Sequence, residues 1–224
     1  MATLHVPDAT QATAIIAAGG ALQLVAADDD KVTVAFGASQ TLAGAPDDRD
    51  LADTFVIDYG EAPVAKVVGD ARGLFGERPT TTELTEFVYR HIKDKAYLGT
   101  FDLASKVAAR RAGDCTEHAV LLTALARANG YPARVAIGVV LIETEDDIAA
   151  FGHAWSEIYD GSGWHLADAT RPQHEEQVVG VRYLPFISLD DEGPGFALDL
   201  ARLSQIQPAR LSRITNASPD RHTR

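Results

Sequence analysis

The pattern of apolar and polar positions divides the chain into a strand-rich first part and a later part in which helices precede strands. Short apolar runs at 22–26 and 32–36 flank an acidic turn, which is typical of a β-hairpin. A third strand is predicted over 54–59, and the charged, Gly- and Pro-containing stretch 43–53 is predicted to be a loop. Residues 1–75 are therefore interpreted as a β-rich N-terminal region of unknown role.

From residue 80 onward, apolar residues recur at helical spacing. This periodicity predicts helices over 81–95, 103–111 and 114–129. The last of these has the clearest apolar stripe. Gly130 follows it directly and Pro132 prevents its continuation, so its end is well marked.

Strands are predicted after these helices. Residues 134–143 form a nearly continuous apolar run rich in β-branched side chains, which indicates a buried strand. An acidic loop over 143–150 follows. Two shorter strands, 152–159 and 164–169, then flank an Asp-Gly-Ser-Gly turn of the kind that closes a hairpin.

The order of these elements predicts an α+β fold with an antiparallel sheet. Further strand is expected near 178–189 and a helical stretch over 196–203. We assign the helices and strands that carry the candidate chemistry to a domain over residues 76–215. Residues 216–224 are expected to form a flexible tail.

Composition and charge narrow the classes of function. The chain has 224 residues, of which 46% are hydrophobic and 23% charged, as expected of a globular protein. Its net charge of −12 argues against nucleic acid and anionic membranes as partners and weakly favours a cationic or amine-bearing substrate. With neither a spanning apolar segment nor a basic leader, we expect a cytoplasmic protein.

The single cysteine, Cys115, excludes an internal disulfide and a zinc site with several thiolates. A lone cysteine is most often a small buried apolar residue. Cys115, however, is placed at the first position of the predicted helix, with Asp114 as its N-cap and Glu117 completing a capping box. The helix dipole favours a thiolate there, whereas the two carboxylates oppose it, so an imidazolium partner is needed.

The predicted hairpin supplies such a partner. If Tyr159 pairs with Trp164, strand alternation places His153 and Asp168 on one face as diagonal neighbours, with Cα atoms roughly 7–8 Å apart. A carboxylate at that distance can orient the imidazole and stabilise its protonated form. These positions suggest a nucleophile, base and acid: Cys115, His153 and Asp168.

The other histidines fit this chemistry less well. His165 lies on the face opposite Asp168 by the same alternation and is interpreted as structural. His118, three residues after Cys115, is an alternative base, but no carboxylate is placed to orient it. Structural roles are also expected for His5, His91, His174 and His222.

Four sequence blocks then suggest a family. They are Gly-Asp-Cys at 113–115, Arg-Ala-Asn-Gly-Tyr-Pro-Ala-Arg at 127–134, His-Ala-Trp-Ser-Glu at 153–157, and Trp-His-Leu-Ala-Asp-Ala-Thr at 164–170. In this order and spacing, residues 80–172 resemble the bacterial transglutaminase-like superfamily of cysteine proteases.

The resemblance implies a papain-like core, in which the helix carrying the cysteine packs on an antiparallel sheet carrying the histidine and the aspartate. It implies that Cys115 attacks an amide carbonyl to form a thioester, with His153 as general acid and base and Asp168 as the orienting carboxylate. The expected substrate is a peptide or protein, with no cofactor and no metal. Hydrolysis is the first expectation and protein-glutamine transamidation the alternative, because either water or an amine can resolve the thioester.

Several points depart from the family pattern or stay open. Residues 1–75 match no part of it. The Cys115 N–H is one candidate donor for an oxyanion, and Tyr97 is a guess for the second. Trp155 and Trp164 line the cleft or pack in the core. The chain lacks the cysteines of the zinc-binding peptide N-glycanases and the Arg-Gly-Gly-x-Cys start of arylamine acetyltransferases.

Other classes of protein also stay open. The acidic run 143–147 is interpreted as a solvated loop rather than a calcium site. A non-catalytic binding module on the same fold is one alternative to an enzyme. An ordinary α+β domain with a structural Cys115 is another.

Overall fold

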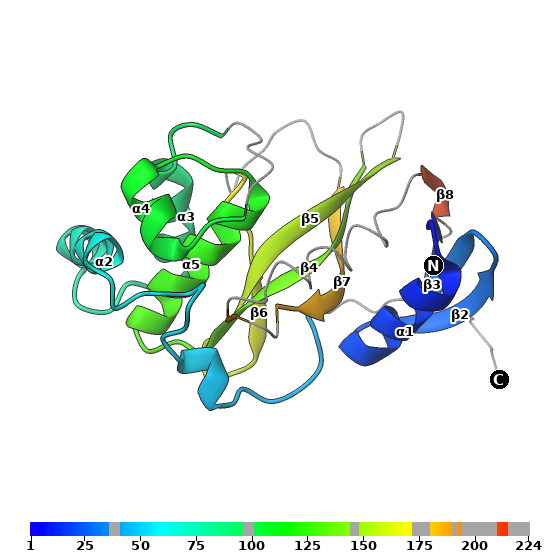
Figure 1. Ribbon diagram of the computed structural model, residues 1–224, viewed down its shortest axis with the longest axis horizontal. Coiled ribbons are helices and arrows are strands. Elements are labelled where there is room, and N and C mark those ends of the chain that lie inside the picture. The colour runs from blue at the N-terminus through cyan, green and yellow to red at the C-terminus, as the bar shows by residue number, and fades with distance from the viewer. Residues whose placement is uncertain are drawn as a thin grey trace, which may run out of the picture.

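The computed structural model describes residues 1–35, 41–95, 101–143, 148–171, 180–189, 192–193 and 210–214. Five α-helices and eight strands follow one another in this part of the chain (Figure 1). In chain order they are β1 (Ala2–His5), α1 (Ala9–Gly19), β2 (Gln23–Asp28), β3 (Lys31–Ala35), a 3₁₀ turn η1 (Asp48–Leu51), α2 (Ala62–Phe75), α3 (Thr81–His91), α4 (Ala104–Arg110), α5 (Cys115–Ala128), β4 (Ala133–Glu143), β5 (Ile148–Tyr159), β6 (Trp164–Ala167), β7 (Gly180–Ser188) and β8 (Arg210–Ile214).

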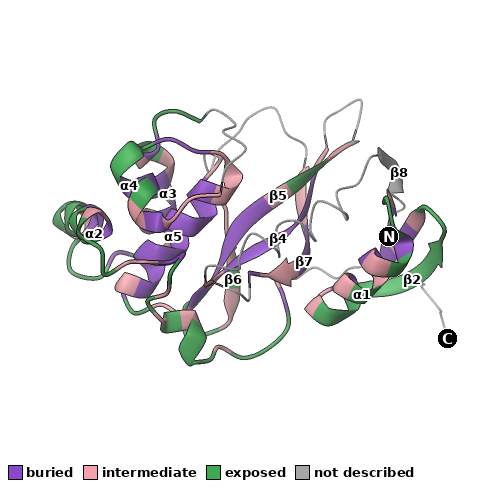
Figure 2. Cartoon of the chain, viewed as in Figure 1, coloured by how far each residue is buried: buried purple, intermediate pink, exposed green. Residues whose placement is uncertain are grey.

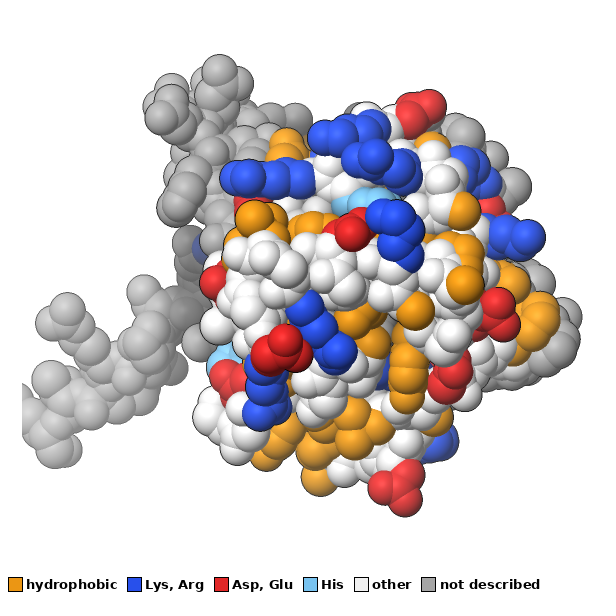
Figure 3. Space-filling model, turned by 90° about the vertical axis from the view of Figure 1, so that its left-hand side faces the viewer, with side chains coloured by type: hydrophobic (Ala, Val, Ile, Leu, Met, Phe, Trp, Pro, Cys, Tyr) orange, Lys and Arg blue, Asp and Glu red, His pale blue; other side chains and the backbone are white. Residues whose placement is uncertain are grey.

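The strands form two antiparallel sheets, which confirms the expected α+β class. The larger sheet has the order β6-β5-β4-β7, and helices α2 to α5 lie on one side of it (Figure 1). The smaller sheet has the order β2-β3-β1-β8 and carries α1, which also contacts β7. The Lys and Arg side chains gather on part of the helical side, where acidic and apolar side chains are also exposed (Figure 3).

The N-terminal part differs from the expectation in two ways. The hairpin is confirmed as β2 and β3, but 54–59 is not a strand, and the helices α1 and α2 were not anticipated. The Thr54 hydroxyl accepts the Ile57 N–H at 3.1 Å, and the Tyr59 N–H donates to the Ile57 carbonyl at 2.9 Å. These local turns use the backbone groups that a strand would need for pairing.

The predicted boundary after residue 75 stays a prediction. Helix α2, on its N-terminal side, packs against α4 and α5, whereas β8, near the end of the chain, pairs with β1. The small sheet is thus built from both ends of the chain. The helical stretch expected over 196–203 and the tail 216–224 lie outside the described residues.

Helix α5 is the centre of the hydrophobic core. All its residues from Glu117 to Arg127 are buried, with α3 and α4 on one side and β4 and β5 on the other (Figure 2). A helix buried on all sides is mostly apolar, which explains its run of Ala, Val and Leu, while its few buried polar side chains, such as Thr123 and Arg127, are hydrogen-bonded. The core therefore holds the Cys115 end of this helix against the large sheet.

The later helices and strands agree with the sequence pattern. The predicted helices correspond to α3, α4 and α5, and the predicted strands to β4, β5, β6 and β7. The acidic loop is shorter than expected, because β4 and β5 stay paired as far as Glu143 and Ile148, and residues 144–147 lie outside the described residues. None of the helices described is both long and apolar enough to span a bilayer.

Candidate active site

The local structure around Cys115 is a helix start fixed by its own side chains. The Asp114 carboxylate accepts the Thr116 N–H at 3.0 Å, and the Glu117 carboxylate accepts the Asp114 N–H at 2.9 Å. This is the predicted capping box, and it makes Cys115 the first residue of α5. The Cys115 side chain is half-buried and packs at the edge of the core.

His153 and Asp168 form a direct hydrogen bond. His153 Nε2 lies 2.9 Å from Asp168 Oδ2, and both side chains are largely buried. The hairpin register that predicted this contact is present, from Tyr159 opposite Trp164 to Ser156 opposite Ala167. Asp168 follows directly after β6, so its carboxylate reaches diagonally to the imidazole.

The Asp168 carboxylate has three further hydrogen bonds. Oδ1 accepts the Thr170 N–H at 2.9 Å and the Thr170 hydroxyl at 2.6 Å, and Oδ2 also accepts the Tyr183 hydroxyl at 2.7 Å. Burial alone would raise the pKa of Asp168, but the hydrogen bonds from His153 and Thr170 hold it well below its usual range. Asp168 is therefore an anion at neutral pH.

The imidazole of His153 connects this carboxylate to Cys115. Burial lowers the pKa of His153, but the hydrogen bonds with Asp168 and with the Cys115 thiol outweigh it and raise the pKa to about 9. Since Nε2 faces Asp168, the nitrogen left for the thiol is Nδ1. The structure thus brings together all three residues that the sequence suggested, with a protonated imidazole between the sulfur and the carboxylate.

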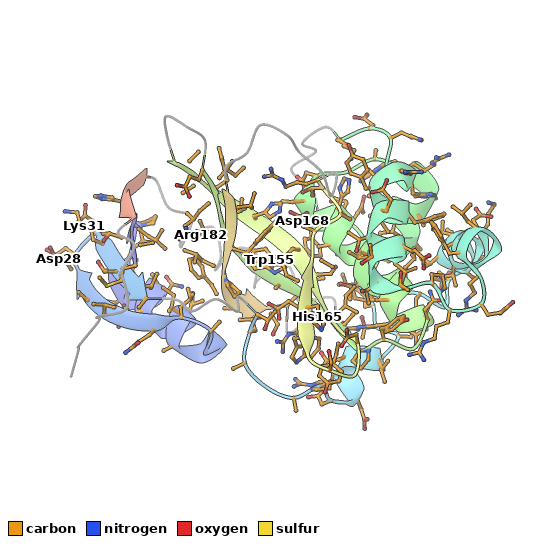
Figure 4. The ribbon with its side chains drawn as sticks, turned by 180° about the vertical axis from the view of Figure 1, so that it is seen from behind. Asp28, Lys31, Trp155, His165, Asp168 and Arg182 are labelled. Carbon is orange, nitrogen blue, oxygen red and sulfur yellow. The ribbon has the colours of Figure 1, made fainter. Side chains whose placement is uncertain are left out.

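Aromatic side chains pack around the imidazole. The Trp155 and Tyr183 ring centroids lie 6.1 and 6.0 Å from that of His153, and Trp155 is buried. In Figure 4, Trp155 and Asp168 lie close together on the large sheet. Trp164 instead donates to the Gly44 carbonyl at 2.9 Å, at the other end of the hairpin. Both tryptophans therefore have packing roles.

The remaining described histidines have partners other than Cys115 and Asp168. His165 Nε2 lies 3.1 Å from the Asp160 carboxylate at the exposed hairpin turn, and His91 Nε2 lies 3.0 Å from the Ala108 carbonyl. His118 Nδ1 lies 2.6 Å from the Asp114 carbonyl, with no carboxylate bonded to its ring. Tyr97, His174 and His222 lie outside the described residues.

Two residues of the site were not identified from the sequence. Thr170 had a local signal, because an Asp-x-Thr turn lets the hydroxyl and N–H of the third residue bind the first carboxylate. Tyr183 had none, because it comes from β7, whose register against β4 shifts between Ile137 and Gly138. In the described part of the chain, no three His, Cys, Asp or Glu side chains are grouped to hold a metal ion.

A buried acid, an imidazole and a thiol at a helix start define the class of cysteine-dependent catalytic centres. Residues 76–169 match the family model of the transglutaminase-like superfamily, so this part of the chain is a transglutaminase-like domain. The match includes all three side chains and supports a cysteine-based catalytic activity.

Two solved structures are also similar to the chain. One is a candidate cysteine protease from Cytophaga hutchinsonii, with 24% identity over 60% of this chain and 46% of that chain, and a TM-score of 0.42. The other is a TGase, with 18% identity over 76% of this chain and 50% of that chain, and a TM-score of 0.34. The chain spans about half the length of each structure. A search of curated proteins gives no match.

Proposed function

We propose that this protein hydrolyses a peptide or amide bond through a thioester formed on Cys115. The observation that carries this proposal is the His153–Asp168 hydrogen bond of 2.9 Å. The same imidazole also interacts with the Cys115 thiol. An ordered acid, base and nucleophile is the arrangement that acyl transfer needs. The proposed substrate is a peptide or protein.

The first half of the reaction forms the acyl-enzyme. The Cys115 thiolate attacks the amide carbonyl, and the negative charge moves to the carbonyl oxygen. The Cys115 N–H occupies the first helical position, so it has no carbonyl partner within the helix and can bind this oxyanion. The C–N bond then breaks as the His153 imidazolium gives its proton to the leaving amine.

The second half releases the acyl group. The neutral His153 imidazole takes a proton from water as the water oxygen attacks the thioester carbonyl, and the Cys115 thiolate leaves. The proton stays on His153, so the ion pair is restored. Throughout, the hydrogen bonds from Thr170 and Tyr183 keep Asp168 charged and oriented toward the imidazole.

The proposal is tested by mass spectrometry of the protein after incubation with a mixture of cell peptides. An acyl adduct is expected on Cys115 of the parent protein. In a His153→Ala variant the adduct should form only at a much lower level. Adding a primary amine separates the two outcomes of the thioester, because transamidation converts the donor peptide to an amide of that amine.

Labelling with iodoacetamide at pH 6 tests the nucleophile directly. Rapid alkylation of Cys115 that is lost in His153→Ala is expected of a thiolate paired with an imidazolium. Slow alkylation in both proteins would instead support a binding module with an inert thiol.

A further inference from the structure

The residue just before the nucleophile, Asp114, is held through both its backbone carbonyl and its backbone N–H. The Asp114 carbonyl accepts two hydrogen bonds from His118, one from its backbone N–H at 3.1 Å and one from ring Nδ1 at 2.6 Å. The Asp114 N–H donates to the Glu117 carboxylate at 2.9 Å. An ordinary helix start has only the bond from the backbone N–H to this carbonyl, so the His118 imidazole adds a second donor to the same oxygen.

The protonation state of this imidazole follows from its partner. A carbonyl oxygen only accepts, so Nδ1 of His118 carries the hydrogen. Burial lowers the pKa of His118, which keeps the ring neutral and leaves Nε2 without a hydrogen. Nε2 is buried and has no hydrogen-bond partner within the described part of the chain.

This arrangement is costly for a residue that only fills space. An unpaired polar atom in the interior costs roughly 1–3 kcal/mol, so an apolar side chain of similar size would pack there more favourably. The benefit of the histidine must therefore come from its Nδ1 hydrogen bond.

That bond acts on the Cys115 N–H. The Asp114 carbonyl and the Cys115 N–H belong to the same planar peptide unit, so fixing the oxygen fixes the direction of the hydrogen. A hydrogen bond to the carbonyl also polarises the peptide unit and makes its N–H a stronger donor. Both effects favour binding of an oxyanion at Cys115.

We propose that His118 is a positioning residue that orients and polarises the Asp114–Cys115 peptide unit so that the Cys115 N–H binds the oxyanion. This inference rests on the proposed acyl transfer. It gives His118 a role distinct from that of His153, which exchanges protons with the reacting groups.

Two pairs of variants isolate the ring's hydrogen bond. His118→Asn keeps a donor for the carbonyl four residues earlier, as the Asn129 amide does to Leu125 at 2.7 Å, whereas His118→Leu has none. His118→Thr and His118→Val give the same contrast at equal size. If one pair does not fold, the other provides the comparison.

Two reagents that modify the same sulfur separate the oxyanion from the thiolate. With p-nitrophenyl acetate, the Cys115 sulfur attacks the ester carbonyl, an oxyanion forms, and p-nitrophenolate leaves as the acetyl thioester is made. With iodoacetamide, the sulfur displaces iodide at a saturated carbon and no oxyanion forms. The burst of p-nitrophenolate and the rate of alkylation are measured for each variant.

In His118→Leu and His118→Val, acetylation of Cys115 should be slower by roughly tenfold or more. This loss is smaller than the roughly 10²–10³-fold loss of rate that follows deletion of an oxyanion donor. The rate of alkylation should change by less than about twofold. The asparagine and threonine variants should recover most of the acetylation rate. Thr123→Val, which removes a buried hydrogen bond to Ser156 one turn further along α5, is the control and should alter neither rate.

Three results would overturn the inference: unchanged acetylation in the leucine and valine variants, a parallel loss of alkylation, or folded asparagine and threonine variants without recovery. A failure of the proposed function gives a different pattern. In that case the parent protein itself would show no acetylation that depends on Cys115, as judged against Cys115→Ala.

Discussion

Replacing Asp168 by asparagine should remove the charge that keeps His153 protonated. The imidazole pKa is about 9 instead of the ordinary 6.5, although burial opposes the charged ring. At 1.36 kcal/mol for each pKa unit, this difference corresponds to about 3 kcal/mol of stabilisation of the folded state. In Asp168→Asn only the interaction with Cys115 still offsets the effect of burial, so the pKa of His153 should fall well below 9.

The sign of the pH dependence follows from linkage. Because the folded-state pKa of His153 lies above the unfolded value, the ring stabilises the fold fully below pH 6.5, and this contribution is lost as the pH rises through about 9. The difference in unfolding free energy between the parent protein and Asp168→Asn should therefore shrink by up to about 3 kcal/mol between pH 6 and pH 10, less whatever Cys115 alone contributes to the pKa of His153.

Urea denaturation at pH 6, 8 and 10 measures this difference, and proton NMR of the His153 ring gives its pKa in both proteins. Asp160→Asn is the matched control, since it breaks the exposed pair with His165, where solvent screens the charges and the pH dependence should not change. A constant stability difference across the pH range, or a His153 pKa near 6.5 in the parent protein, would refute the reasoning.

The remaining predictions concern the residues that support the carboxylate and the sheet. Tyr183→Phe should lower the unfolding free energy by about 2 kcal/mol, because a buried anion loses a donor, and an unchanged urea midpoint would contradict this. Gly138→Ala should destabilise by more than about 2 kcal/mol, since its Cβ would overlap the Leu184 carbonyl oxygen of β7. In Gly69→Ala of α2, the added Cβ meets no atom within 4 Å, so this change should stabilise the protein by up to about 1 kcal/mol. Equal melting temperatures for the two glycine variants would contradict the predicted clash between β4 and β7.

The site could be predicted from the sequence where its geometry is local. The turn residues between Tyr159 and Trp164 set the register of β5 and β6, and strand alternation then places His153 beside Asp168. The capping residues Asp114 and Glu117 likewise mark where α5 starts. These contacts depend on residues a few positions apart or on one hairpin, so the pattern alone determines them.

Contacts between distant segments could not be predicted in this way. Tyr183 reaches Asp168 from β7, and a bulge beside Gly138 sets the register of that strand. Helix α1 was missed because alanine and threonine dominate it, and α2 because two glycines interrupt its apolar periodicity. Packing against the rest of the protein stabilises both helices, and in α1 the alanines and the Asp8 N-cap favour the helix locally as well.

The structure also shows how the two carboxylates at the start of α5 affect the charge around Cys115. Two carboxylates beside Cys115 should disfavour a thiolate, and an imidazolium was needed to offset them. Burial raises the pKa of Glu117 to about 7, so at neutral pH this carboxyl is charged only part of the time. His153, by contrast, stays almost fully protonated there. The buried glutamate can therefore keep its capping hydrogen bond to Asp114 while placing less negative charge beside Cys115 than its formal charge suggests.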